Sequence, residues 1–219
     1  MASSATELLW ISLPLLAKGA AQTLAISALG ILFATLGGVL YGVLATWGNR
    51  VLNLILQVYL ELFRAIPVLV WLYLVFFGLP IFFALSIPSF WCAVLVLGLW
   101  GASEIGEVVR GALQSLPRGQ REAGLSIGLS TGQLYGHVLL PQALKRMTPP
   151  TINIFTRIIK TSSLAVLIGV VEVIKVGQQI IERTYESVLI YGALFVFFFL
   201  VCYPLSAASR VLERRWAHA

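Results

Sequence analysis

The chain is organised around the stretch Arg121-Glu122-Ala123-Gly124-Leu125-Ser126-Ile127-Gly128, followed after nine further residues by Val138-Leu139-Leu140-Pro141. Both runs lie in the only long polar segment, about residues 112–150, of a chain that is otherwise apolar. Such an insert between apolar segments must lie in water at one face of a membrane. The first run predicts a short helix that ends at Gly128. A second short helix, from Gln133 to Leu139, is expected to begin at a Ser130/Thr131 cap and to stop before Pro141.

Composition indicates the class of protein. Of the 219 residues, 59% are hydrophobic and 11% are charged, and the mean hydropathy is +0.92. These values are typical of a polytopic membrane protein. The net charge of +6 does not indicate a nucleic-acid partner, because the basic residues cluster at the ends of apolar segments and form no single stripe. Cys92 and Cys202 both fall in apolar segments, so we expect buried free thiols.

Five apolar runs are long enough to cross a membrane, and they place residues 1–219 in a single all-α transmembrane domain. The spans are expected at about 20–47, 52–77, 91–111, 151–173 and 188–212. The run Leu8–Leu16 is too short to cross and contains Pro14, so we expect it to lie along the interface. The breaker Pro149-Pro150 is expected to precede the fourth span. The polar segment 112–150 then connects the third and fourth spans.

The distribution of Lys and Arg predicts the orientation of the chain. With the 112–150 segment in the cytoplasm, three basic residues lie outside, namely Lys18, Lys175 and Arg183. Nine lie inside, namely Arg50, Arg110, Arg118, Arg121, Lys145, Arg146, Arg210, Arg214 and Arg215. Under the positive-inside rule this asymmetry places the N-terminus outside and the C-terminus in the cytoplasm.

Several classes of chemistry lack the residues that they need. The chain contains no G-x-x-x-x-G-K-[ST] run, so it has no P-loop to hold nucleotide phosphates. His137 and His218 are too few and too far apart for a metal cluster, and no His is placed to serve a nucleophile triad. We therefore expect no catalytic residue, no metal and no cofactor. The energy for any transport must come from another protein.

Ionisable side chains inside the spans are candidates for a substrate site, because a charge in the membrane is costly unless it faces a watery cavity or a partner. Glu61 and Arg64 share one face of the second span. Further polar side chains in the third and fourth spans are Glu104, Glu107, Arg110, Arg157, Lys160, Thr161, Ser162 and Ser163. The same spacing of three residues groups Glu104 with Glu107 and Arg157 with Lys160. Each pair is a structural ion pair, a snorkelling end near the interface or part of a solute site. We favour the structural pair for Glu107 and Arg110, and the solute site for Glu61, Arg64 and Lys160–Ser163.

Glu122-Ala123, Gly128 and Val138-x-Leu140-Pro141 resemble, in identity and spacing, the conserved loop of permease subunits of ATP-binding-cassette (ABC) importers. The family pattern reads Glu-Ala-Ala, three residues, Gly, nine residues, Ile-x-Leu-Pro. This chain has Gly124 for the third position and Val138 for Ile. The flank 111–120 resembles the polar amino-acid branch of that family.

Three further stretches carry the same resemblance. Residues 61–67 resemble the family's Phe-Arg-x-x-Pro motif, 102–111 its Ala-Glu-Ile…Arg-Gly stretch, and 159–164 its Lys-Asp-Thr-Ser-Leu stretch. Thr161 stands where many members have Asp. This departure removes an anion from the expected cavity and makes a cationic amino acid a less natural substrate.

The resemblance implies a role and a set of partners. It implies the membrane-spanning subunit of an importer in a bacterial cytoplasmic (inner) membrane that moves a polar amino acid, with glutamate, glutamine or aspartate favoured. ATP would be hydrolysed by a cytoplasmic ATPase dimer. The other implied partners are a second permease subunit, in a homo- or heterodimer, an extracytoplasmic amino-acid-binding protein and membrane lipid.

The resemblance also assigns residues. The implied ATPase-coupling residues are Arg121, Glu122, Ala123, Gly124, Gly128, Leu140 and Pro141. The expected substrate-binding residues are Glu61, Arg64, Lys160, Thr161, Ser162 and Ser163. The alternative is a secondary transporter or channel that works without ATP. Secondary transporters are often built from repeated halves, which five spans fit poorly.

Overall fold

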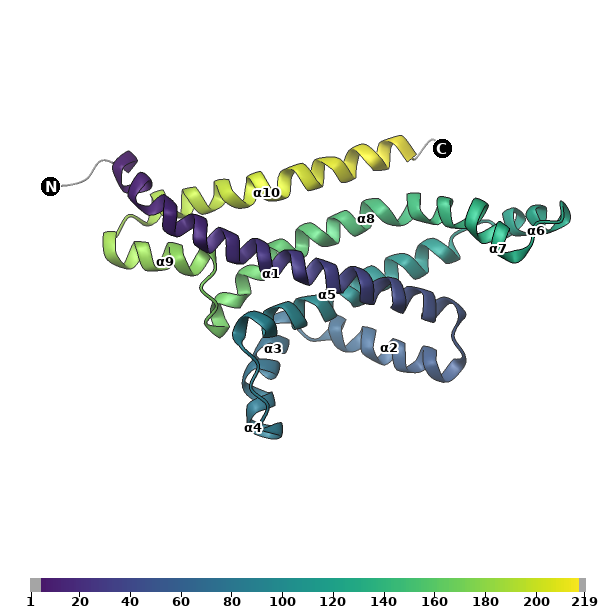
Figure 1. Ribbon diagram of the computed structural model, residues 1–219, viewed down its shortest axis with the longest axis horizontal. Coiled ribbons are helices and arrows are strands. Elements are labelled where there is room, and N and C mark those ends of the chain that lie inside the picture. The colour runs from purple at the N-terminus through teal and green to yellow at the C-terminus, as the bar shows by residue number, and fades with distance from the viewer. Residues whose placement is uncertain (1–4, 217–219) are drawn as a thin grey trace.

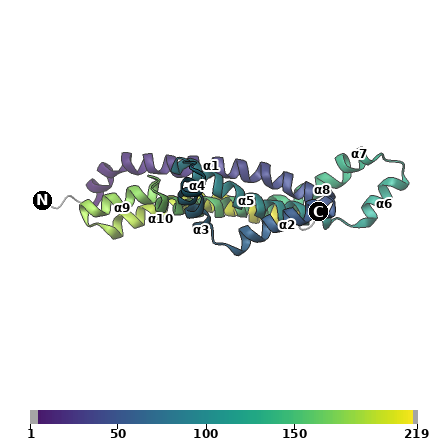
Figure 2. The ribbon, with the colours of Figure 1, turned by 90° about the horizontal axis from the view of Figure 1, so that it is seen from below.

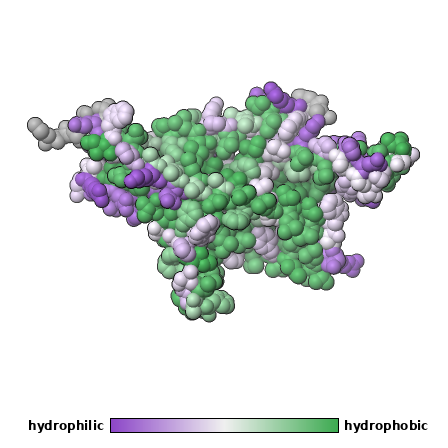
Figure 3. All heavy atoms as spheres, in the orientation of Figure 1, coloured by the Kyte–Doolittle hydropathy of each residue, from purple (hydrophilic) through white to green (hydrophobic). Residues whose placement is uncertain are grey.

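The computed structural model describes residues 5–216, and His218 lies outside this part. The described residues form helices and no strand (Figure 1). Four helices are long and apolar enough to cross a membrane, and a bent helix pair gives a fifth crossing if it counts as one span. Apolar side chains cover the middle of the molecule, and hydrophilic side chains gather toward its two ends (Figure 3). This distribution suits a hydrocarbon layer between two aqueous layers. The predicted all-α membrane class is confirmed.

The first span belongs to a longer helix than the sequence predicts. Helix α1 runs from Ala5 to Trp47 and contains Pro14, so the predicted separate interfacial segment at 8–16 is wrong. The 43 residues of α1 extend for about 64 Å, roughly twice the thickness of the hydrocarbon core. Leu8 and Leu16 pack into an apolar cluster with helix α9, Val173–Thr184. This packing offsets the hydrogen bond that Pro14 removes.

Helix α5, Ser89–Gln114, lies at the centre of the bundle and has the most buried residues of the long described helices. Helix α1 packs along it at close range. A Cβ atom on Gly38 would lie 2.6 Å from Ile105 Cβ, and one on Gly42 would lie 2.5 Å from Val109 Cβ. The two backbones therefore approach so closely that only glycine fits, as is common between membrane helices.

The second span is broken. Helix α2, Arg50–Ala65, is followed by a turn of 104° into a short arm. The arm consists of α3 (Val68–Tyr73), a π-helical turn (Leu74–Gly78) and α4 (Leu79–Phe83), and Figure 1 shows it pointing away from the other helices. The span expected over 52–77 is therefore divided between two segments that meet at a sharp bend. The break falls at Ile66, which is extended with φ −100° and ψ 126° because it precedes Pro67.

The polar segment forms a helical projection at one end of the molecule. Helix α6 runs from Arg118 to Ser126, and helix α7 from Thr131 to Leu134. Gly128 has a φ of +83°, a conformation that glycine adopts without steric cost, and it ends α6 as predicted. The Ser130 hydroxyl accepts from the Gln133 N–H, and the Gln133 side chain accepts from the Ser130 N–H. The predicted cap is confirmed as a capping box.

The prolines that follow do not end helices. A π-helical turn, Tyr135–Leu139, continues directly into α8, Leu140–Thr161. Pro141 lies in the first turn of α8 and Pro149-Pro150 in its interior. The second short helix therefore does not stop before Pro141, which corrects that prediction, and the helix that contains the expected fourth span begins well before Pro150.

Position and packing explain why α8 tolerates these prolines. Pro141 follows directly on the π-helical turn, and local adjustments of this kind let a helix accommodate a missing N–H. The interior pair frees the carbonyls of Lys145 and Arg146, and both residues are exposed, so water can reach them. Pro149 is buried and its carbonyl accepts from Ser209 Oγ of α10 (Ser187–Trp216) at 3.0 Å. Tertiary contacts therefore keep α8 continuous, although its local sequence would break a helix.

The helical stretch that contains the expected fourth span ends before residue 173. A 3₁₀ turn, Ser162–Ile168, leads to Gly169, whose φ of +84° ends the helix. Helix α9 follows, and α10, Ser187–Trp216, contains the predicted fifth span. Helix α9 and the start of α1 lie at one end of the molecule, and α6 and α7 lie at the other (Figure 2).

Candidate functional site

Polar side chains from three helices line a groove of about 400 Å³ between α1, α2 and α5, which we call the charged groove. Its ionisable lining residues are Tyr41, Glu61, Arg64, Glu107 and Arg110. Glu61 and Arg64 come from α2, whereas Glu107 and Arg110 come from α5. Amides from both helices complete the lining: Asn53, Gln57 and Gln114. Two of the predicted substrate-binding residues therefore lie beside charges from a neighbouring helix.

Glu107 is at the centre of the ion pairs in the charged groove. Its two oxygens accept from Arg110 Nε at 2.7 Å and from Arg110 Nη2 at 2.9 Å. The predicted structural pair of Glu107 and Arg110 is confirmed, in the bidentate geometry that is strongest for such pairs. Arg64 Nη2 lies 3.5 Å from Glu107 Oε2, and the Arg64 side chain is 44% exposed. The guanidinium of Arg64 therefore retains donors that can reach a solute.

Glu61 does not pair with Arg64. Among the described residues, the ion pairs join Arg64 and Arg110 to Glu107, and Arg157 to Glu104. Although Glu61 and Arg64 share a helix face, Arg64 contacts the neighbouring helix instead. Glu61 is exposed and lines the charged groove. Its carboxylate oxygens are therefore available to accept hydrogen bonds.

The candidate residues of the fourth span lie elsewhere. Lys160 lines a second groove of about 530 Å³ between α8 and α10, together with Cys202 and Arg210. This groove shares no lining residue with the charged groove. Ser162 is buried, with its Oγ 3.2 Å from Ser27 Oγ, and Ser163 Oγ donates to the Lys160 carbonyl at 2.7 Å. One chain therefore does not gather Glu61, Arg64 and the Lys160–Ser163 segment, which includes Thr161, in a single cavity.

A cross-helix ion pair joins Glu104 of α5 to Arg157 of α8. Arg157 Nη1 lies 2.8 Å from Glu104 Oε2, and the Arg157 guanidinium lies 5.1 Å from the centre of the Trp100 ring, within reach of a cation–π interaction. Helical spacing in the sequence grouped Glu104 with Glu107 on α5. The spacing could not reveal that the partner of Glu104 lies on another helix.

Glu172 is a buried acid that the sequence analysis did not single out. Its Oε1 accepts from the Lys175 N–H at 2.9 Å as the N-cap of α9. Thr23 Oγ1 of α1 lies 3.3 Å from Glu172 Oε2 and accepts from the Val173 N–H at 3.1 Å. These bonds attach α9 to α1. The signal in the sequence was a lone acid within the apolar run Val170-Val171-Glu172-Val173-Ile174.

The projection exposes most of the predicted coupling residues. Arg121, Glu122, Ala123, Gly128, Leu140 and Pro141 are all exposed. Gly124 is buried instead, because a Cβ atom there would lie 2.5 Å from Leu134 Cδ1, so it allows α6 to pack on α7. Ile127 was missed by the sequence analysis, and at 78% exposure it is an apolar side chain on a polar projection. An exposed apolar residue of this kind is typical of a contact surface.

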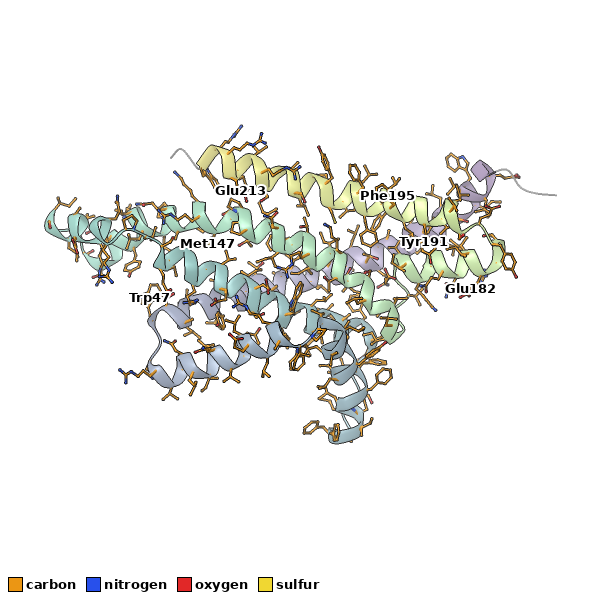
Figure 4. All side chains as sticks on the ribbon, turned by 180° about the vertical axis from the view of Figure 1, so that it is seen from behind. Trp47, Met147, Glu182, Tyr191, Phe195 and Glu213 are labelled. Carbon is orange, nitrogen blue, oxygen red and sulfur yellow. The ribbon has the colours of Figure 1, made fainter. Side chains whose placement is uncertain are left out.

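Two contacts lie where the projection meets the spanning helices. Arg146 Nη1 of α8 donates to Ser115 Oγ at the end of α5 at 2.8 Å. The ring of Trp47, at the end of α1, lies 5.5 Å from that of Tyr135. Figure 4 shows Trp47 near the projection and Glu182 of α9 at the opposite end of the molecule. The base of the projection therefore lies beside the ends of α1, α5 and α8.

A helical bundle that crosses a membrane, carries a charged groove and extends a helical projection at one end has the features of a transport protein. Residues 30–218 match the family described as the binding-protein-dependent transport system inner membrane component, and the chain belongs to this family.

Individual relatives agree with this family. The chain is 38% identical over 208 residues to the glutamine transport system permease protein GlnP of Escherichia coli strain K12, and the match covers 94% of this chain and 95% of that protein. It is 32% identical over 199 residues to the L-cystine transport system permease protein TcyL of Bacillus subtilis strain 168, covering 88% and 83%.

Solved structures share the fold. An amino acid ABC transporter crystallised with histidines superposes with a TM-score of 0.87 and 26% identity, over 98% of this chain and 100% of that one. The inward-facing MetNI methionine ABC transporter gives a TM-score of 0.74 at 22% identity, over 93% and 97%. The latter likeness concerns the fold alone.

Family membership decides between the two predicted functions. The chain is the permease subunit of an ABC importer, in the polar amino-acid branch of that family, and the alternative of an ATP-independent transporter is set aside. It is a multi-pass inner-membrane component and not an enzyme, since ATP hydrolysis belongs to a separate subunit. Membership also implies an ATPase and a binding protein as partners.

Proposed function

We propose that residues 1–219 form one transmembrane permease domain that takes a glutamine-, glutamate- or aspartate-like amino acid from a binding protein and releases it into the cytoplasm. The charged groove is the observation that supports this assignment best. It offers the available carboxylate of Glu61 and the available guanidinium donors of Arg64, which together suit a zwitterion. The similarity to a glutamine permease over nearly the whole chain supports the same substrate class.

In this proposal, Glu61 accepts from the substrate ammonium group and Arg64 donates to its carboxylate. The 3.5 Å contact between Arg64 and Glu107 is loose enough for a substrate carboxylate to compete for the guanidinium. Lys160, Thr161 and Ser163 line a second part of the pathway, and the buried Ser162 holds this segment against α1 through Ser27. Lys160 is exposed beside α10, and a cation in a span needs water or a partner. We assign the exposed face around Lys160 to the contact with a second permease subunit, in a homo- or heterodimer.

Coupling to ATP is assigned to the projection. Arg121, Glu122 and Ala123 on α6, with Gly128, Leu140 and Pro141, would contact a groove on each subunit of a cytoplasmic ATPase dimer, and Gly124 would hold α6 on α7. ATP binding would close the ATPase dimer and move the projection. The spans would then open the substrate cavity alternately to the two sides by rigid-body motion.

Uptake by the reconstituted transporter tests this function. The chain, its ATPase and candidate binding proteins are placed in proteoliposomes, and uptake of labelled glutamine is measured with ATP inside. We expect ATP-dependent uptake that excess glutamate or aspartate reduces and excess arginine leaves unchanged. A complex whose ATPase has lost its P-loop lysine is the matched control. Uptake without ATP, or competition by arginine alone, would contradict the proposal.

The proposed orientation makes a separate prediction. The projection lies in the cytoplasm, and α9 lies outside, because nine basic residues flank the spans on one side and three on the other. Cysteines introduced as Gly119→Cys on α6 and Glu182→Cys on α9 both replace exposed residues. In intact cells a membrane-impermeant thiol reagent should label the second and not the first, whereas after lysis it should label both. The native thiols, Cys92 and Cys202, are buried and provide the background. The reverse pattern would overturn the orientation.

A further inference from the structure

A groove of about 520 Å³ lies between helix α9 and residues 15–22 of α1. These two segments lie at the end of the molecule opposite the projection (Figure 2). We call it the outer groove. Its polar lining consists of two cations and two amides: Lys18 and Gln22 from α1, and Gln179 and Arg183 from α9. Apolar side chains such as Leu15 and Ile180 form its floor.

The outer groove is held rigidly. A Cβ atom on Gly19 would lie 2.8 Å from Val176 Cγ2 and 2.9 Å from Val173 Cα, so the α1 backbone touches α9 directly. Leu16, Val173, Val176 and Ile180 pack in one buried cluster beneath it. The buried Glu172 cap adds hydrogen bonds between the same two helices. Lys18 and Arg183 therefore project from a fixed platform, and a partner that binds them does not have to order the backbone first.

The charge of the outer groove is positive and uncompensated. Lys18 and Arg183 are both exposed, and neither takes part in an ion pair within the described residues. No carboxylate lines the groove. Of the acids on or beside these two helices, Glu7, Glu182 and Glu186 are exposed and Glu172 is buried in its cap, and none of them lines the groove. The groove therefore attracts an anionic surface, with amides beside the cations to receive further hydrogen bonds.

We propose that the outer groove docks an acidic patch on the extracytoplasmic binding protein. The inference rests on the proposed function, because it uses the proposed orientation. Under that orientation the groove faces the side from which a binding protein must approach. Helix α9 is not among the helices long and apolar enough to span, and with the start of α1 it lies at the end of the molecule opposite the projection (Figure 2). Two cations flanked by two amides suit a protein surface, which offers carboxylates together with amide and peptide groups.

Charge reversal in the groove tests the proposal. The full complex of permease and ATPase is placed in nanodiscs of phosphatidylcholine, and ATPase activity is titrated with the binding protein that supports uptake. The variants are Lys18→Glu, Arg183→Glu and both together. Lys175→Glu is the matched control, because Lys175 lies on the same helix but does not line the groove.

The double variant should need a binding-protein concentration at least about tenfold higher for half-maximal stimulation, since like charges then face each other. Its basal ATPase activity should equal that of the wild type, and Lys175→Glu should titrate like the wild type. Added salt should raise the half-maximal concentration for the wild type and much less for the double variant.

Two results would contradict the docking site without contradicting the proposed function. One is a double variant that titrates like the wild type. The other is a defect seen only in nanodiscs with anionic phospholipid and absent in phosphatidylcholine, which would make the groove a lipid headgroup site. A wild-type complex that no binding protein stimulates would instead overturn the proposed function, and the docking site with it.

Discussion

The substitution Gly128→Arg is expected to abolish association with the ATPase while leaving the spans folded. A Cβ atom at Gly128 would meet nothing within 4 Å, so an arginine side chain would extend from the exposed tip of the projection and create no clash within the chain. It would occupy the space where we place the ATPase surface. Because Gly128 has a φ of +83°, a non-glycine residue adds local strain of about 1–2 kcal/mol, which is small beside the packing of the spans.

The measurement is a pull-down of the ATPase by the purified permease, with uptake as a second readout. Gly128→Asn is the matched control, because asparagine tolerates the left-handed conformation and has a small, neutral side chain. We expect the asparagine variant to retain the ATPase and most of its transport. An arginine variant that still retains the ATPase and transports normally would refute the role assigned to the projection.

The substitution Glu61→Gln is expected to lower uptake strongly without affecting stability. The change converts a charge-assisted hydrogen bond to the substrate ammonium group into a weaker one, worth about 1.5–3 kcal/mol, so substrate affinity should fall roughly ten- to hundredfold. Stability should not change, because Glu61 has no ion pair among the described residues. The readouts are substrate affinity and uptake, together with the melting temperature of the purified complex.

Glu107→Gln is the structural comparison for this experiment. Glu107 contacts both Arg110 and Arg64, so its neutral replacement leaves two guanidinium groups without their carboxylate. We expect a lower melting temperature for Glu107→Gln and a wild-type one for Glu61→Gln. A Glu61→Gln complex with unchanged affinity and uptake would remove Glu61 from the substrate site.

Features that depend on neighbouring residues could be predicted from the sequence. The apolar runs predicted the spans, because hydrocarbon requires helices about twenty residues long. The end of α6 at Gly128 and the capping box of Ser130 and Gln133 followed from backbone conformation and from hydrogen bonds over three residues. The pairing of Glu107 with Arg110 was predicted for the same reason, since helical spacing alone brings the two side chains together.

Features that depend on which helices meet were decided by tertiary structure alone. Pro14 and Pro149-Pro150 looked like breaks, but packing of α1 on α9 and of α8 on α10 keeps their helices continuous. Arg64 shares a helix face with Glu61 and nevertheless contacts Glu107, because α5 brings that carboxylate closer.

The buried position of Glu172 also could not be predicted from the sequence, because it exists only where α9 folds back onto α1. Residue spacing determines which side chains share a face of one helix. The partner that this face meets depends on the packing of helices far apart in the chain, where close backbone contact and the cost of an unpaired charge select one arrangement.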